Sequence, residues 1–326
     1  MKELDYNEFS NYFYLHAVPV LKNLEKKRRI LKKLNTCYNI FGYIIGILFV
    51  IIIFGTPELA NNIWLAHIYM IFQFSIVLYM AMFVPMSILK RYLRKNFSKQ
   101  LYKNVLQKFE LSYTNSSREK EFAAKNVRHI CENSKIFPAC EYIEVDDIIK
   151  GEYKGLPFTI YDVDIFYYEN SRRSTSHVSA FRGIFLATKS NKSFKGETLI
   201  KTDKNSNNPK EIEQKQRVKL EDIEFENFFE VYSTDQIEAR YLLTTAFMER
   251  LKNFKIQKQY PIEILFSREK YMDENVFFFF DTRKDHFEVD INKNLLDKNV
   301  LYDVLLEISE MLKVVDALKL DQNIGM

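Results

Sequence analysis

Glycine and cysteine are both scarce in this chain, which has 8 glycines and 3 cysteines among 326 residues. Loops that cradle phosphate groups need glycine, and the phosphate-binding, dinucleotide-binding, zinc-protease and nucleophile-elbow motifs are all missing. Cys37, Cys131 and Cys140 form no even framework, so disulfides are not expected. His129 and the last two cysteines have irregular spacing and lack a fourth ligand, so we expect no metal and no cofactor. These absences favour a protein that is not an enzyme and leave that question open.

Aspartate, glutamate, lysine and arginine are missing from two apolar stretches near the N-terminus, Leu34–Pro57 and Leu59–Leu89. The 22 residues from Leu34 to Gly55 make about 33 Å of helix, which is enough to cross a hydrocarbon core of about 30 Å. The second stretch is longer than one span requires. Residues Met1–Glu8 are acidic and polar, which argues against a secretory signal peptide. The sequence therefore predicts a transmembrane hairpin.

Lysine and arginine are missing from the connecting loop 55–62 and crowd outside both spans. Because basic flanks stay in the cytoplasm, both termini should be cytoplasmic. A composition rich in Lys, Asn, Ile, Phe and Tyr indicates a bacterium, so we expect a multi-pass protein of the bacterial inner membrane. The net charge of +4 comes largely from these flanks, so no nucleic-acid partner is expected. The residues that we expect to contact lipid head groups are Lys26, Lys27, Arg28, Arg29, Lys32, Lys33, Lys90, Arg91, Arg94 and Lys95.

The spacing of hydrophobic residues divides the chain into segments. We expect an amphipathic basic helix over residues 1–33, kinked near Pro19, the hairpin over 34–89, a juxtamembrane helical stalk over 90–134 and an intracellular domain over 135–326. In that domain the period changes from about four to two, and the predicted strands are 158–166, 181–188, 197–201, 226–232, 262–267, 276–281 and 287–291. The result is an α+β fold with a mostly antiparallel sheet and at least two packed helices.

Local signals refine this domain. Residues 197–201 should pair with the strand before them, and the Phe277–Phe280 run should form a central strand buried on both faces. Ser233 and Gln236 have the spacing of a capping box that opens a helix ending near Asn253. On that helix we expect Tyr241 and Phe247 to lie on or beside the buried face. A last amphipathic helix runs through 301–315.

Three stretches carry a family resemblance: Ile148-Ile-Lys-Gly-Glu-Tyr-Lys-Gly, Phe181-Arg-Gly-Ile-Phe and, above all, residues 229–251, Phe-Glu-Val-Tyr-Ser-Thr-Asp-Gln-Ile-Glu-Ala-Arg-Tyr-Leu-Leu-Thr-Thr-Ala-Phe-Met-Glu-Arg-Leu. With the basic helix and the hairpin before them, the chain resembles the bacterial membrane-protein family catalogued as domain of unknown function 3137. The likeness runs over nearly the whole chain. It implies the same topology and brings no reaction and no catalytic residues.

Four residues are candidates for a ligand or partner site. Asp162 and Asp164 project from one face of a strand, where paired carboxylates serve acid–base chemistry or cation binding. Over such a site we favour the solvated face of an edge strand. Arg182 and Arg240 lie in family-like stretches and suit either an anionic ligand or, as we favour, an ion pair with a carboxylate of the domain.

These observations predict a two-pass inner-membrane protein that presents a cytoplasmic α+β binding or scaffolding domain. Its partners would be the lipid bilayer and, in addition or instead, a protein partner or further copies of the chain. Two alternatives remain: a membrane-anchored enzyme that uses carboxylates of the β-domain, and a small subunit of a transporter or channel assembly.

Overall fold

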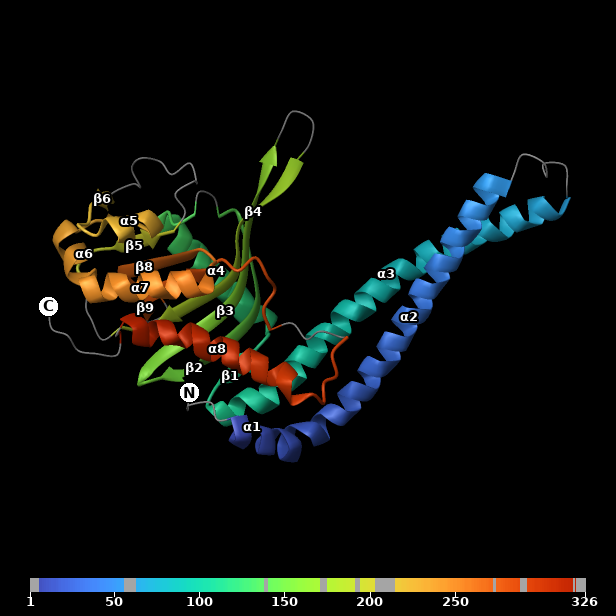
Figure 1. Ribbon diagram of the computed structural model, residues 1–326, viewed down its shortest axis with the longest axis horizontal. Coiled ribbons are helices and arrows are strands. Elements are labelled where there is room, and N and C mark those ends of the chain that lie inside the picture. Colours follow the sequence, from blue (N-terminus) through green and yellow to red (C-terminus); the bar gives the residue numbers. More distant parts are fainter. Residues whose placement is uncertain are drawn as a thin grey trace. The chain divides into compact units, whose positions relative to one another are not determined.

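The computed structural model describes residues 6–55, 63–137, 140–170, 175–190, 194–202, 215–271, 274–287, 292–318 and 320. It divides into two compact units (Figure 1). The helical unit comprises Tyr6–Leu101 and Glu288–Leu301. The sheet unit comprises Met1–Asp5, Tyr102–Phe287 and Tyr302–Met326.

The helical unit begins with α1 (Tyr6–Tyr12), one π-helical turn (Phe13–Ala17) and α2 (Val18–Gly55), and it continues with α3 (Ile63–Leu106). The expected kink at Pro19 takes the form of this π turn, and the chain stays helical through it. Proline cannot donate a bond to the carbonyl one turn earlier, and a π turn is a common way to absorb such a local break.

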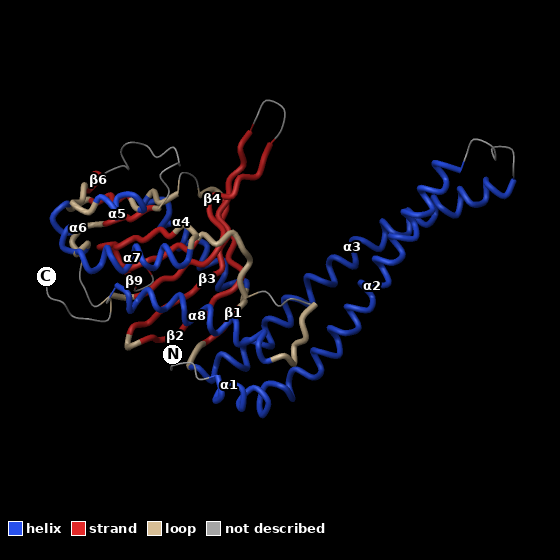
Figure 2. The backbone as a smooth tube through the Cα atoms, in the orientation of Figure 1, coloured by secondary structure: helices blue, strands red, loops and turns tan. Residues whose placement is uncertain are grey.

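Helices α2 and α3 pack against each other as an antiparallel pair (Figure 2). The rings of Tyr38 and Tyr79 stack with their centroids 4.5 Å apart. A Cβ atom on Gly42 would come 2.9 Å from the hydroxyl of Tyr79, so this glycine permits the close approach of the two helices. The outward apolar side chains are uncovered: Tyr43 is 75 % and Phe74 is 71 % exposed.

The described residues of the sheet unit form a nine-stranded sheet in which every pair is antiparallel, in the order β1-β2-β3-β4-β9-β8-β5-β7-β6. Its strands are β1 (Ser112–Thr114), β2 (Tyr142–Tyr153), β3 (Leu156–Asn170), β4 (Thr175–Thr188), β5 (Thr198–Lys201), β6 (Gln216–Val218), β7 (Glu230–Ser233), β8 (Ile262–Tyr271) and β9 (Glu274–Phe280). Its helices are the 3-10 turn Gln107–Phe109, α4 (Ser117–Ser134), α5 (Ile223–Phe228), α6 (Gln236–Leu242), α7 (Thr245–Lys258) and α8 (Lys298–Leu318). The predicted α+β class is confirmed.

Strand β9 lies at the centre of this sheet, and its four phenylalanines are fully buried. Phe277 and Phe279 belong to the core that α4 covers, whereas Phe280 faces the other side and meets Phe254 of α7, with ring centroids 6.2 Å apart. Figure 1 shows α7 and α8 on the face of the sheet opposite α4. The expected central strand, buried on both faces, is confirmed.

Several details differ from the expectations. Helix α4 packs Val127 and Ile130 into the domain core, so the segment expected as a stalk contributes a layer of the domain. Strand β5 pairs with β7 and β8, and β4 pairs with β9 instead. Residues 223–228, at the start of an expected strand, are helical. The strand expected at 287–291 lies almost entirely outside the described residues.

The helix expected from Ser233 to Asn253 is two helices, α6 and α7. Ser233 is the last residue of β7, and the cap of α6 is Asp235, whose carboxylate accepts bonds from the backbone N–H groups of Ile237 and Glu238. Thr244 caps α7 and accepts a bond from Phe247 N–H. A new helix direction after Leu243 changes which residues face the core.

Candidate functional site

The family-like stretch 229–251 holds the start of β5 in place. The carboxylate of Glu238 accepts bonds from the backbone N–H groups of Lys195 at 2.6 Å and Gly196 at 2.8 Å. The hydroxyl of Thr234 accepts a bond from Glu197 N–H at 2.9 Å. A Cβ atom on Gly196 would come 2.4 Å from that hydroxyl, so a side chain does not fit there. The most family-specific stretch therefore has a structural explanation.

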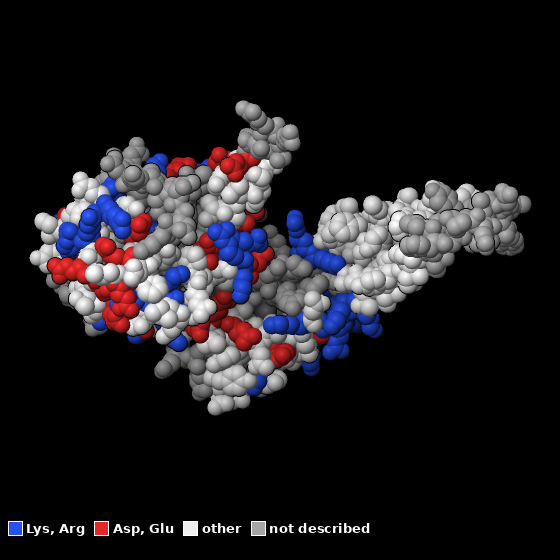
Figure 3. Space-filling model, turned by 45° about the horizontal axis from the view of Figure 1, so that its top comes forward, with Lys and Arg blue, Asp and Glu red and all other residues white. Residues whose placement is uncertain are grey.

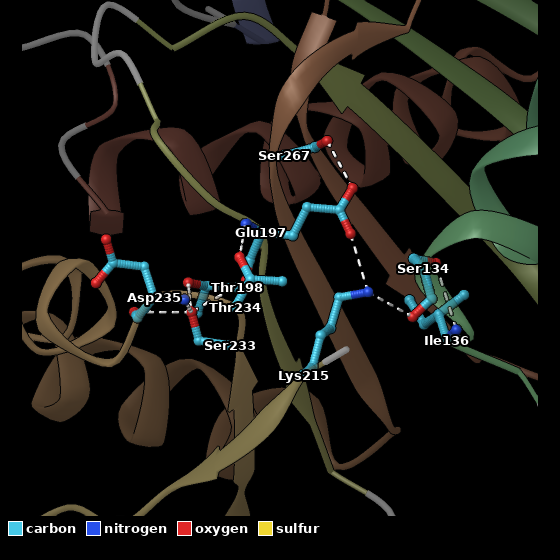
Figure 4. Close-up of polar contacts among 9 residues, drawn as sticks. All are labelled: Ser134, Ile136, Glu197, Thr198, Lys215, Ser233, Thr234, Asp235 and Ser267. Atoms are coloured by element: carbon cyan, nitrogen blue, oxygen red, sulfur yellow. Dashed lines mark hydrogen bonds and ion pairs between the residues drawn. The ribbon is translucent and has the colours of Figure 1, made fainter. Parts of the chain in front are cut away.

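An ion pair between the buried Lys215 and the partly exposed Glu197 continues this network (Figure 4). The ammonium of Lys215 lies 2.9 Å from the carboxylate of Glu197 and donates to the carbonyl of Ser134 at 3.2 Å. Ser267 donates its hydroxyl proton to the same carboxylate at 3.0 Å. These contacts join the end of α4 to β5, β8 and the residue before β6. Because Lys215 is only 4 % exposed and fully engaged, we read the pair as structural.

Arg240 lies apart from the other three candidates. It is exposed on α6, which packs against the edge strand β6, and it donates to the carbonyl of Gln236 at 2.9 Å and to that of Lys219 at 3.4 Å. These are local backbone contacts. Its neighbour Tyr241 is 68 % exposed, so the expectation that Tyr241 faces the core is wrong, whereas Phe247 is buried as expected.

The other three candidates meet across β3 and β4. Asp164 is opposite Arg182 in the register, with the guanidinium 3.5 Å from the carboxylate, and Arg182 also reaches Asp285 at 2.9 Å. Strand β3 lies between β2 and β4, and Asp162 is 4 % exposed. The favoured interpretation of these carboxylates as the solvated face of an edge strand is therefore wrong.

Asp162 accepts a hydrogen bond from the backbone N–H of His286 at 2.9 Å. Burial raises the pKa of Asp162 to about 8, and the charges of Asp147, Asp285 and Asp146 act in the same direction. The carboxyl is therefore mainly protonated at neutral pH. A protonated acid donates a hydrogen bond and cannot act as a general base.

The segment after β9 adds residues that sequence reasoning missed. The imidazole of His286, 6 % exposed, has a contact at each ring nitrogen: Nδ1 lies 2.8 Å from the carboxylate of Glu307 on α8, and Nε2 lies 2.5 Å from the hydroxyl of Thr282. The three residues form a chain of hydroxyl, imidazole and carboxylate. Only the run Asp281-Thr-Arg-Lys-Asp-His286, dense in charge directly after a buried strand, signals this site in the sequence.

Other contacts fix this segment against β4. The carboxylate of Asp281 accepts a bond from Arg182 N–H at 3.3 Å and pairs with Arg283 at 2.8 Å. Arg283 N–H in turn donates to the carbonyl of Arg182 at 2.9 Å. Gly183 lies against the segment, since a Cβ atom there would come 2.2 Å from the carbonyl of Phe280. We call the set Asp162, Asp164, Arg182, Asp281, Thr282, Arg283, Asp285, His286 and Glu307 the 281–286 cluster.

The expected lipid contacts lie at the ends of the apolar helices. Figure 3 shows lysine and arginine gathered at the base of the hairpin, next to its uncharged described surface. The basic residues that are exposed are Lys26, Lys27, Arg29, Lys32, Lys33 and Arg91, and Lys90 is half-buried. Arg94 and Lys95 are not among the residues whose side chains the structure describes.

Arg28 is the exception among these residues. It is 5 % exposed and donates two bonds of 2.7 Å to the carboxylate of Glu25, so within the helical unit it forms a buried ion pair. The expectation of a lipid contact is wrong for this residue. Burial alone would raise the pKa of Glu25, but the bonds from Arg28, Arg29 and the N–H of Leu295 outweigh it and lower the pKa to about 2.

The cysteines and His129 do not form a metal site. Cys131 is buried and its thiol hydrogen-bonds to that of Cys140, whereas the ring of His129 contacts the side chain of Asn133 at 3.3 Å. Among the described residues, no group of three or more histidine, cysteine, aspartate or glutamate side chains is placed to hold a metal ion.

Taken together, the fold defines a class: an α+β protein with an antiparallel sheet, preceded by two helices long and apolar enough to cross a membrane. The family model described as "Protein of unknown function (DUF3137)" matches residues 179–320, so this part of the chain is similar to that family. The match runs from β4 to α8 and includes the stretches at Phe181 and Phe229; the hairpin and the stretch at Ile148 lie outside it. No curated protein and no solved structure matches the chain.

Proposed function

We propose that the protein is a two-pass protein of the bacterial inner membrane that presents its α+β domain in the cytoplasm as a binding or scaffolding module. The apolar exterior of α2 and α3 carries this proposal. Phe74, Met80 and Phe83 are 71 %, 69 % and 59 % exposed, and many other apolar side chains of the pair are exposed as well. A large contiguous apolar surface is rare on a protein that meets only water. In hydrocarbon the same surface is stabilising.

The charge distribution supports the proposed orientation. The uncharged helix segments lie between basic residues before α2 enters the apolar stretch and after α3 leaves it. Lys26, Lys27 and Lys32 are exposed, which suits contact with anionic lipid head groups. Each such contact contributes about 1 kcal/mol near an anionic surface.

A topology assay tests the proposal. A reporter that works only outside the cytoplasm should be active when fused near Glu58 and inactive when fused after Lys99 or at Met326. As a matched control, moving basic residues from the helix ends into the loop 56–62 should weaken or invert this pattern. Reporter activity at Met326 in the unaltered chain would refute the orientation. If as much protein were recovered from the soluble fraction as from the membrane fraction, the membrane anchor would be refuted.

A binding role is favoured over catalysis by the carboxylates of β3. Asp164 is tied to Arg182, and Asp162 is buried with a raised pKa, so neither offers a free carboxylate at neutral pH. If the domain binds a protein partner, a tagged full-length chain should capture it from membranes in a mild detergent. The transporter-subunit alternative needs several copies, because the segments 34–55 and 63–89 contain no aspartate, glutamate, lysine or arginine. Cross-linking in membranes tests it.

A further inference from the structure

We propose that Thr282 is a nucleophile, activated by His286 and Glu307, that accepts an acyl group from a carboxylic ester. The proposal goes beyond the binding role and is independent of it. Its basis is the order of the three groups. Thr282 Oγ1 lies 2.5 Å from Nε2 of His286, and Nδ1 of the same ring lies 2.8 Å from Glu307. A nucleophile within hydrogen-bond reach of a base, itself oriented by a third group, is the arrangement that activates a hydroxyl.

The carboxylate sets the tautomer of the ring. An ionised Glu307 can only accept a hydrogen bond, so Nδ1 of His286 carries the proton and Nε2 is left as the acceptor for the Thr282 hydroxyl. The position of the ring is fixed from a second side, because the backbone N–H of His286 donates to Asp162 at 2.9 Å. The base is therefore held in the orientation that receives the hydroxyl proton.

The proposed base is buried, next to a threonine that is partly exposed. Thr282 is partly exposed, whereas His286 is 6 % exposed. Gly183 allows the Thr282 hydroxyl to lie close to the backbone of β4, since a Cβ atom on Gly183 would come 2.8 Å from Thr282 Oγ1. Arg182 and Arg283 place two guanidinium groups in the same cluster, where they pair with Asp285 and Asp281.

The reaction balances without any further reactant. Thr282 Oγ1 attacks the ester carbonyl carbon and its proton passes to Nε2 of His286. The bond from that carbon to the leaving oxygen breaks, and His286 returns the proton to the departing alcohol. Water then attacks the acyl-threonine by the same proton exchange, which releases the carboxylic acid and restores the hydroxyl.

Covalent labelling of the full-length chain in detergent tests the proposal. A biotinylated fluorophosphonate reacts with an activated hydroxyl, forming an oxygen–phosphorus bond and releasing fluoride. Peptide mass spectrometry should locate the label on Thr282. Thr282→Val should abolish it, and Thr282→Ser should retain it. His286→Asn should slow it by about 10²-fold or more, the usual contribution of a general base. Ser179→Ala is the matched control, because this neighbouring hydroxyl contacts Asp164 and Arg283 and should not affect labelling.

The alternative is that Thr282, His286 and Glu307 only hold the segment after β9 against α8. In that case the wild-type chain and Thr282→Ser remain unlabelled although both melt cooperatively, and the proposal is wrong. A label on another residue, unchanged in His286→Asn, also overturns it. If His286→Asn fails to fold, the comparison of Thr282→Ser with Thr282→Val still decides, because both keep the imidazole.

Discussion

Phenylalanine occurs in both units of this protein, in opposite surroundings. On α3 of the helical unit, Phe74 is 71 % exposed, whereas on β9 of the sheet unit Phe277–Phe280 are 0 % exposed. Charged groups show the same contrast. The sheet unit buries Lys215 in an ion pair with Glu197, whereas the apolar part of the hairpin contains no Asp, Glu, Lys or Arg. The sheet unit gains its stability from burial away from water. The hairpin keeps its apolar groups outside, which is favourable only in a non-aqueous medium.

The largest effect should come from the core of the sheet unit. Phe279→Ala removes a ring packed against Phe181 and Phe185, with centroids 5.5 Å and 4.5 Å away, and should cost about 3–5 kcal/mol of unfolding free energy. Phe74→Ala, the matched change on the hairpin, should leave the domain transition unchanged. Thermal melting of the full-length chain in detergent, followed by circular dichroism, measures both. Equal losses would contradict the contrast between the units.

The next effect concerns the ion pairs that each unit buries. Lys215→Met removes the cation from the Glu197 carboxylate and should cost about 2 kcal/mol. This is less than the roughly 3–5 kcal/mol for a fully buried pair, because Glu197 is partly exposed and Ser267 still donates to it. Arg28→Met in the helical unit should cost less, since Glu25 keeps its bonds from Arg29 and from Leu295 N–H.

Melting curves of the two variants give the comparison. In the sheet unit, the double variant Lys215→Met/Glu197→Gln should recover part of the loss, because no uncompensated charge remains. A Lys215→Met variant as stable as wild type would show that this pair contributes little.

The two units should also respond to pH in opposite directions. Asp162 has a folded pKa near 8, above the unfolded value of about 3.9, so the folded state holds a proton that the unfolded state releases. Its contribution to stability is complete below about pH 4 and is lost as pH rises to about 8, with a slope of at most about 1.4 kcal/mol per pH unit. Glu25, with a pKa near 2, contributes above about pH 4 and loses its contribution as pH falls.

Asp162→Asn removes the titration at this position and keeps the shape of the protonated acid. Its melting temperature should match wild type below about pH 4, exceed it increasingly from about pH 4 to about pH 8, and exceed it by a constant amount above that. Burial also raises the pKa of Asp147, to about 6. Because Asp147 titrates in both proteins, its effect does not appear in the difference between their melting temperatures. A pH-independent difference between the two proteins would show that Asp162 is not protonated in the folded state.

The smallest effect should come from the exposed surface of α6. Arg240→Ala removes side-chain bonds to backbone carbonyls at an exposed position and should cost about 0–1 kcal/mol. Tyr241→Ala should be similarly mild, because Tyr241 is exposed. Phe247→Ala is the buried comparison on the next helix and should cost several times more. A severe loss with Arg240→Ala would mean that this side chain supports the fold.

Properties that depend on neighbouring residues could be predicted from the sequence. The central β9 strand follows from four consecutive phenylalanines, and α8 follows from apolar residues at helical spacing. The break between α6 and α7 could not be predicted, because Ser233 and Gln236 have the spacing of a capping box. In the structure Ser233 is the last residue of β7, and its hydroxyl bonds to that of Thr198. Tyr241 was misplaced for the same reason, since a continuous helix would have turned it inward.

The sequence by itself determined the apolar, uncharged hairpin with its basic flanks and the antiparallel α+β class, because length, charge and period are local properties of the chain. Only the tertiary structure decided which distant residues meet. Asp162 and His286 are 124 positions apart, yet they share a hydrogen bond because β9 lies beside β4 and β4 beside β3. The pairing of strands is a property of the whole sheet, so neither the protonated carboxyl nor the chain of Thr282, His286 and Glu307 is visible before the strands are in place.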